Sequence, residues 1–258
     1  MKKSWIVIAV IASLLFQVGL ASALTSGEAK QTWLSAMQTR ITADAAYKQA
    51  QLDYAANKTP ENDKKVIDTA KAVLGAALDE AAAWLKWKNE EAKESDASAE
   101  LKVNIGKDVE KNLAKIDGLK NEVVAIKTRG EVVVVFLKMV GSYVELLTDV
   151  ARNTGEVWVY MGNQIADKTA DFEIKLRTTA NGLVDNTAIL AKLDIAKSEI
   201  DLARTQINAA NTSYKLVVLP GTPLIKFAEG NSYLRQAKVN LSAATGQLQE
   251  AFNLIISQ

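Results

Sequence analysis

The chain has 258 residues, of which 24% are charged, and its 31 basic and 30 acidic residues leave a formal net charge of +1. It contains neither cysteine nor histidine. The first absence excludes disulfides, and the second removes the commonest general base and a principal zinc ligand. Basic and acidic residues are interspersed along the chain, which argues against nucleic-acid binding. We therefore expect no cofactor, no metal site and no nucleic-acid partner.

The first 23 residues have the pattern of an export signal. Lys2 and Lys3 precede an apolar stretch, and Ala21-Ser22-Ala23 supplies the small residues of a cleavage site. The apolar stretch is shorter than the ~20 residues that span a bilayer comfortably. We expect export to the cell surface, the periplasm or the medium, with cleavage after Ala23. An uncleaved N-terminal anchor is the alternative.

Residues 24–258 predict a single all-α domain, an elongated antiparallel bundle of six or seven helices around a largely apolar central helix. Three parts are expected: a helical hairpin over residues 27–94, central helices over 98–182, and a second hairpin over 186–257. Apolar residues recur at spacings of three and four in each part, which is the period of an amphipathic helix.

The first hairpin has a clear turn signal. Its first helix is expected from Ser26 or Gly27 to about Asn57. Thr59-Pro60 then supplies an N-cap and a proline at the first helical position, which together predict the start of the second helix.

Three tryptophans suggest an aromatic cluster in this hairpin. Trp84 and Trp87 are three residues apart, and Trp33 is expected opposite them on the first helix. Such a cluster is usually packing, and a small-ligand pocket is the alternative.

Residues 131–152 follow the expected end of a third helix at Thr128-Arg129-Gly130 and are apolar almost throughout. The apolar positions of greatest interest are Val132, Val133, Val134, Val135, Phe136, Leu137 and Val140. The charged residues Lys138, Glu145, Asp149 and Arg152 fall on one narrow stripe of a helix. The segment is therefore expected to be the buried central helix, although the valine run would also suit a strand. A further alternative is that residues 131–147 insert into a membrane, which would cost about 2.5–3.5 kcal/mol for each charge at the bilayer centre.

A new helix is expected after this segment. Asn153-Thr154-Gly155-Glu156 has the spacing of a capping box, and Asn181-Gly182 has the residues of a helix stop.

The C-terminal hairpin carries the most regular pattern. Large residues recur every seven positions with alanine three residues later, which describes the seam of a left-handed supercoil. The seam residues are Leu193, Ala196, Ile200, Ala203, Ile207 and Ala210 on one helix, and Leu234, Ala237, Leu241, Ala244 and Leu248 on the other. The loop from Pro220 to Pro223 is short enough to require an antiparallel return.

These patterns favour a non-catalytic function. The chain shows no nucleophile motif, no glycine-rich phosphate loop and no recognisable pair of catalytic carboxylates, so we expect no enzyme activity. The leading hypothesis is an exported helical-bundle protein with a structural or protein-interaction role, acting through self-association or an unidentified protein partner. The alternatives are a membrane-active, pore-forming-like protein that inserts residues 131–147, and a carrier of a small apolar ligand.

Overall fold

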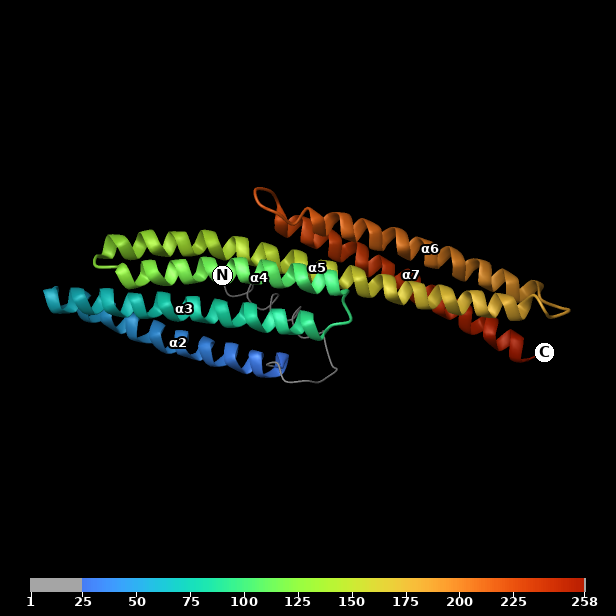
Figure 1. The fold of residues 1–258 in the computed structure, drawn as a ribbon, viewed down its shortest axis with the longest axis horizontal. Helices are drawn as coiled ribbons and strands as arrows, with labels where there is room; N and C mark the ends of the chain where they lie inside the picture. The colour runs from blue at the N-terminus through green and yellow to red at the C-terminus, as the bar shows by residue number, and fades with distance from the viewer. Residues whose placement is uncertain (1–24, 258) are drawn as a thin grey trace. The chain divides into compact units, whose positions relative to one another are not determined.

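The structure is a computed structural model that describes residues 25–257, so the expected signal peptide and its cleavage site lie outside the described residues. Within that range the chain forms six helices and no strand, which confirms the all-α class (Figure 1). The helices are α2 (Ser26–Ala56), α3 (Pro60–Glu94), α4 (Ala99–Ala125), α5 (Arg129–Ala180), α6 (Thr187–Lys215) and α7 (Pro223–Ile256).

The described residues form two compact units, and the division between them in the chain falls within α5. The first unit, up to Leu146, contains α2, α3, α4 and the first part of α5. The second unit, from Leu147, contains the rest of α5 with α6 and α7. Because α5 runs through this division without a break, the single domain over residues 24–258 stays a prediction.

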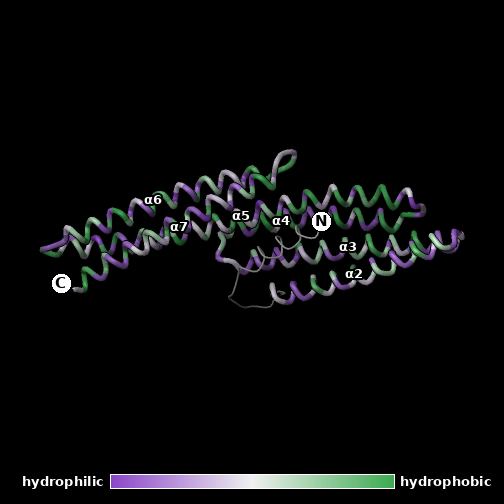
Figure 2. Tube along the Cα trace, turned by 180° about the vertical axis from the view of Figure 1, so that it is seen from behind, coloured by the Kyte–Doolittle hydropathy of each residue, from purple (hydrophilic) through white to green (hydrophobic). Residues whose placement is uncertain are grey.

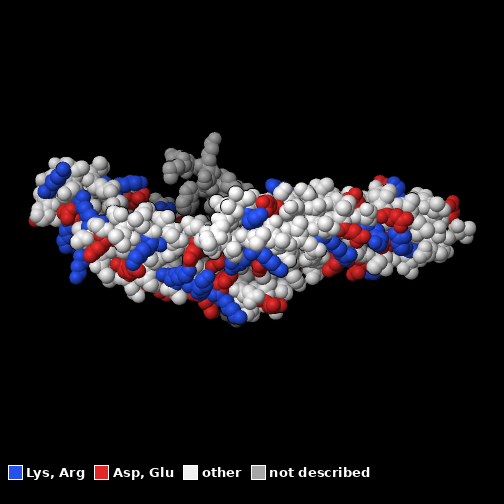
Figure 3. Space-filling model, turned by 90° about the horizontal axis from the view of Figure 1, so that it is seen from above, with Lys and Arg blue, Asp and Glu red and all other residues white. Residues whose placement is uncertain are grey.

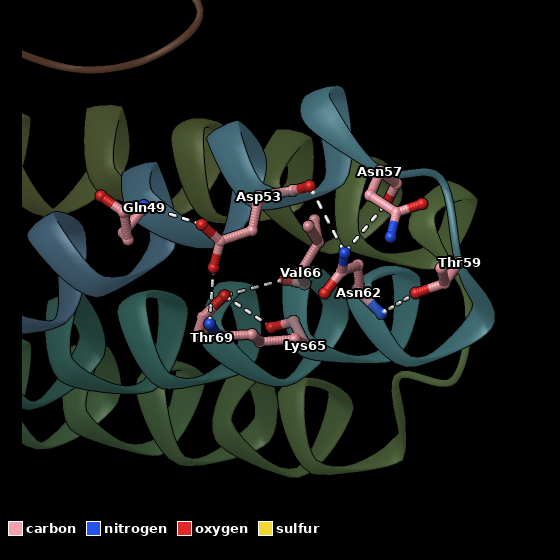
Figure 4. A network of polar contacts seen from close by, with 8 residues as sticks. All are labelled: Gln49, Asp53, Asn57, Thr59, Asn62, Lys65, Val66 and Thr69. Atoms are coloured by element: carbon pink, nitrogen blue, oxygen red, sulfur yellow. Dashed lines mark hydrogen bonds and ion pairs between the residues drawn. The ribbon is translucent and has the colours of Figure 1, made fainter.

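The turn between α2 and α3 is held by the polar residues that surround it (Figure 4). Thr59 is the N-cap of α3, as expected, and its side chain accepts a 3.2 Å hydrogen bond from the backbone N–H of Asn62. The Asn62 amide donates in turn to the carbonyl of Asn57, at 2.8 Å. Lys65 of α3 lies 2.6 Å from Asp53 of α2, and this hydrogen bond lowers the pKa of Asp53. Local capping therefore closes the hairpin where the sequence predicted.

The break between α4 and α5 also falls where it was expected. The ammonium group of Lys71 on α3 donates to the carbonyls of Val124 and Ile126, at 2.9 and 3.2 Å. A lysine from a neighbouring helix thus satisfies carbonyl groups that the end of α4 leaves without helical partners. At the start of α5, the carboxylate of Glu131 accepts hydrogen bonds from the backbone N–H groups of Lys127 and Thr128.

The prediction that a new helix begins after Asn153 is wrong. Helix α5 continues through this position for 52 residues, from Arg129 to Ala180. The hydroxyl of Thr154 donates to the carbonyl of Val150 one turn earlier, a bond that a residue within a helix makes. Asn153 is buried, and Gly155 lies against a ring from α6. This polar sequence therefore serves packing in the second unit and does not start a helix. The four-valine run is helical, so the strand alternative is also wrong.

In the second unit, α5 packs with both helices of the C-terminal hairpin. Ten of the eleven seam residues named above are buried, and Leu234 is half-buried. Eight of the buried seam residues share their clusters with residues of α5: one cluster contains Val159 and Ala166, and the other contains Leu176 and Ala180. Hydrophilic and hydrophobic residues alternate along these helices (Figure 2). The core of this unit is thus shared by three helices.

Candidate functional site

The first part of α5 is not the buried centre of a bundle, which corrects the expectation from sequence. One side of it is packed, because Val135, Met139 and Leu146 are buried and Val132 is half-buried. The other side is open to solvent. The residues with 45–62% of their surface exposed are Val133, Val134, Phe136, Leu137, Val140 and Val144, here named the α5 apolar face. The helix is apolar on nearly all sides, but the first unit covers only one of them.

The α5 apolar face forms a continuous stripe. Val133, Leu137, Val140 and Val144 follow spacings of four, three and four, which places them on one side of the helix. At 1.5 Å per residue this stripe is about 16 Å long. With six roughly half-exposed side chains, the face presents roughly 500 Å², which is near the upper end of the largest apolar patches on ordinary monomers.

No charge interrupts the α5 apolar face. The two charged residues between Val132 and Leu146 point to α4 instead, where Lys138 lies 2.6 Å from Glu122 and Glu145 pairs with Lys115. Elsewhere acidic and basic groups are mixed on the surface, as the viewed face in Figure 3 shows. The charged stripe predicted from sequence therefore joins α5 to α4 in the first unit, and the solvent-facing side is left uncharged.

A cleft of about 300 Å³ adjoins the α5 apolar face. It lies between α2, α3 and the first turns of α5, and Val133 belongs to both the cleft and the face. Its lining residues are Tyr47, Gln51, Tyr54, Val66, Ile67, Ala70, Arg129, Val132 and Val133. The volume is at the lower limit of ordinary small-molecule sites, and the walls are mainly apolar and aromatic, as such sites require.

Arg129 supplies the positive charge of this cleft. Its guanidinium carbon lies 3.8 Å from the ring centroid of Tyr54, and its Nε donates to Asp63 at 2.6 Å. The side chains of both charged residues are more than 40% exposed, so this ion pair is weak and open to exchange. Sequence reasoning missed Tyr47, Tyr54 and Arg129 as a group. The only available signal was Tyr47 and Tyr54 seven residues apart on one side of α2.

The tryptophan cluster is a packed element. Trp33 was expected opposite Trp87 across the hairpin, and the two rings stack with their centroids 4.9 Å apart. The ammonium group of Lys88 lies 3.8 Å from the Trp87 centroid, and Lys88 also bonds Glu91 at 2.7 Å. Burial lowers the pKa of Lys88 and raises the pKa of Glu91. Because Trp87 is buried, we place the candidate ligand site in the cleft beside Tyr47 and Tyr54.

Two further observations apply to the described part of the chain. Between residues 25 and 257, no helix combines the length and the apolarity needed to cross a membrane. The same residues contain no cluster of three or more acidic side chains placed to hold a metal ion. Comparison of the chain with models of protein families, with curated proteins and with solved structures gives no significant match.

Proposed function

We propose that this is an exported, non-catalytic helical-bundle protein with a structural or protein-interaction role at the cell surface, in the periplasm or outside the cell. The observation that carries the proposal is the α5 apolar face. Exposing a continuous apolar stripe to water is unfavourable, and such surfaces commonly mark sites where another molecule binds. The spacing of the stripe suits a helix of a partner protein, because residues i, i+4, i+7 and i+11 are the usual anchors of helix packing.

The second unit supports a structural component of this role. Ala196, Ala203 and Ala210 on α6, with Ala237 and Ala244 on α7, are all buried. Small residues at alternating seam positions allow close approach of the two helices, and we propose that the seam makes a stiff hairpin of them. A rigid hairpin would hold a binding surface without itself taking part in chemistry.

The size of the α5 apolar face bears on how strongly it binds. Stable complexes bury about 800 Å² on each partner, and the face offers roughly 500 Å². The cleft extends this surface along α2 and α3. We therefore propose reversible self-association through the α5 apolar face, in which the same face of a second copy supplies the partner helix.

Light scattering coupled to size exclusion tests this proposal. We expect the average mass of the wild-type protein to rise with concentration, and Leu137→Glu to abolish the rise because its carboxylate would be buried without a partner. The matched control is Val124→Glu on α4, because Val124 is 73% exposed in the same unit and lies outside the face. A wild-type mass that stays monomeric at every concentration would contradict self-association, as would an equal effect of Val124→Glu.

The cleft favours a second candidate function, the binding of a small apolar ligand. Apolar side chains from α3 and α5 line it, and Tyr54 and Arg129 supply polar groups beside them. We expect an environment-sensitive apolar dye to bind with one site per chain. Ile67→Trp should weaken this binding about tenfold or more because the larger ring would occupy part of the cleft. Ile41→Trp is the matched control, since Ile41 is on α2 outside the cleft. Equal dye binding by wild type and Ile67→Trp would contradict this function.

The membrane-active alternative uses the same helix differently. It requires residues 131–147 to leave their packed position, which breaks the ion pairs of Lys138 and Glu145 with α4. Leakage of dye from liposomes, compared between the wild type and Val134→Asp, separates it from the leading proposal. Absence of leakage at any pH or lipid composition would exclude it.

A further inference from the structure

The loop between α6 and α7 is unusually apolar for an exposed turn. Ten consecutive residues between Lys215 and Lys226, Leu-Val-Val-Leu-Pro-Gly-Thr-Pro-Leu-Ile, carry no charge. Five of them are large apolar residues with 39–79% of their surface exposed: Leu216, Val218, Leu219, Leu224 and Ile225. These five residues are here named the hairpin tip, and Figure 1 shows this loop at the end of the α6–α7 hairpin. Sequence reasoning used the loop only as a turn and missed its apolar character.

The loop that carries the hairpin tip is attached to the core of the second unit. Val217, the second residue of the same loop, is completely buried, and it belongs to one cluster with Tyr214 of α6. Phe227 of α7 packs against that cluster, with its ring centroid 5.6 Å from that of Tyr214. The loop therefore turns one apolar side chain inward and holds the others outward on a fixed base.

Part of the loop backbone already has its hydrogen bonds within the protein or lacks a donor, whereas the first turn of α7 has no side-chain cap from Thr222. The N–H of Val217 donates to the carbonyl of Tyr214 at 3.0 Å, and the N–H of Val218 donates to that of Leu216 at 2.9 Å. Pro220 and Pro223 have no N–H to satisfy. Each N–H group that is bonded within the protein, or missing, lowers the cost of moving the loop out of water.

We propose that the hairpin tip is a peripheral membrane anchor that inserts into the interface of a lipid bilayer with anionic headgroups. Its leucine, valine and isoleucine side chains would lie at the boundary between headgroups and acyl chains, as on proteins that sit about 5–10 Å deep in that layer. Lys215 and Lys226 bracket the uncharged run, so their ammonium groups lie at headgroup level when the tip is inserted. Lys226 also pairs with Glu229 at 2.8 Å, and because these side chains are 33% and 41% exposed, this ion pair is weak and can be exchanged for an anionic headgroup. This charge complementarity is the reason for choosing an anionic lipid surface as the occupant. Such an anchor needs no membrane-spanning helix.

Binding to vesicles tests the anchor with the whole chain. The probes are vesicles of phosphatidylcholine alone and vesicles with about 30% phosphatidylserine, because each lysine near an anionic surface contributes roughly fivefold to binding. We expect the wild-type protein to sediment with the anionic vesicles and more weakly with the neutral ones. Leu224→Ser/Ile225→Ser should reduce binding to both by about tenfold or more, since two apolar side chains no longer enter the interface. Both residues are exposed, so the double variant leaves the core intact.

The matched control removes two other exposed apolar residues of the second unit. Val184→Ser/Val239→Ser changes residues that are more exposed than most of the tip and lie outside it, so we expect unchanged vesicle binding. A fluorescent dye provides a second measurement. Because the chain contains no cysteine, Leu224→Cys or Val239→Cys introduces a single thiol to which an environment-sensitive dye can be attached. The emission maximum of the dye at position 224 should shift to shorter wavelength when vesicles are added, and that of the dye at position 239 should not.

Four outcomes would overturn the anchor. The first is that the wild type does not sediment with either kind of vesicle, and the second is that the tip variant binds vesicles as well as the wild type does. The third is that the control variant loses as much vesicle binding as the tip variant, and the fourth is that the emission of the dye at position 224 does not change when vesicles are added. A wild-type protein that ignores vesicles but self-associates through the tip would show that a second copy covers it. The anchor is independent of the proposed self-association, which Leu137→Glu tests in the first unit.

Discussion

Replacing Gly155 by alanine should lower the free energy of unfolding by about 3 kcal/mol or more, because the new methyl group would overlap a buried ring. A Cβ atom on Gly155 would lie 2.3 Å from Cγ and Cδ1 of Tyr214. The ring has no room to retreat, because a Cβ atom on Gly230 of α7 would lie 2.5 Å from its Cε1. Its hydroxyl is also fixed, since it donates to Oδ1 of Asn231 at 2.6 Å.

Urea unfolding followed by circular dichroism measures this effect. Gly246→Ala is the matched control, because no heavy atom lies within 4 Å of the Cβ position at Gly246 on α7. Alanine within a helix is favoured over glycine by about 0.5–1 kcal/mol, so the control should be neutral or stabilising. Gly155→Ala combined with Tyr214→Leu should be less destabilised than the sum of the two single changes. Equal stability of Gly155→Ala and Gly246→Ala would show that α5 and α6 are not this close.

Replacing Trp87 by alanine should destabilise the protein by about 3–5 kcal/mol, the range found when a large buried aromatic side chain is removed. Trp87 is 4% exposed, and its ring contacts α2 through the stack with Trp33. Two ammonium groups also lie near the ring, those of Lys88 at 3.8 Å and of Lys30 at 5.4 Å. The substitution therefore removes packing and leaves the half-buried Lys88 without its aromatic neighbour.

Trp33→Ala and the double variant separate these contributions. Trp33 is only partly buried, so its loss should cost less than the loss of Trp87. The coupling free energy between the two positions should be about 0.5–1.5 kcal/mol, the usual value for an aromatic pair. Stability losses that add without coupling, or a loss below about 1 kcal/mol for Trp87→Ala, would contradict the stacked arrangement.

The helix boundaries that could be predicted are those set by neighbouring residues in the chain. Thr59 and Pro60 begin α3, and Asn181-Gly182 follow the end of α5, because a cap or a stop acts within one turn of its own position. The sequence at Asn153–Glu156 has the same local form but does not start a helix. There the deciding contact is with Tyr214, a residue 59 positions later, which requires a glycine at position 155. No local pattern contains that information.

The candidate surfaces divide in the same way. The sequence by itself determined that charges in residues 131–152 fall on one stripe of a helix, which favoured a helix over a strand, and that the α6–α7 loop is uncharged, because periodicity and composition are properties of the chain alone. Which side of each segment is covered depends on how many neighbours pack against it. Only the tertiary structure shows that α5 buries Val135 and Met139 while exposing Val133 and Leu137, and that the loop buries Val217 while exposing Leu224. The hydrophobic effect is not directional and favours the burial of any apolar residue. The pattern of apolar residues alone therefore could not show which of them are exposed to solvent.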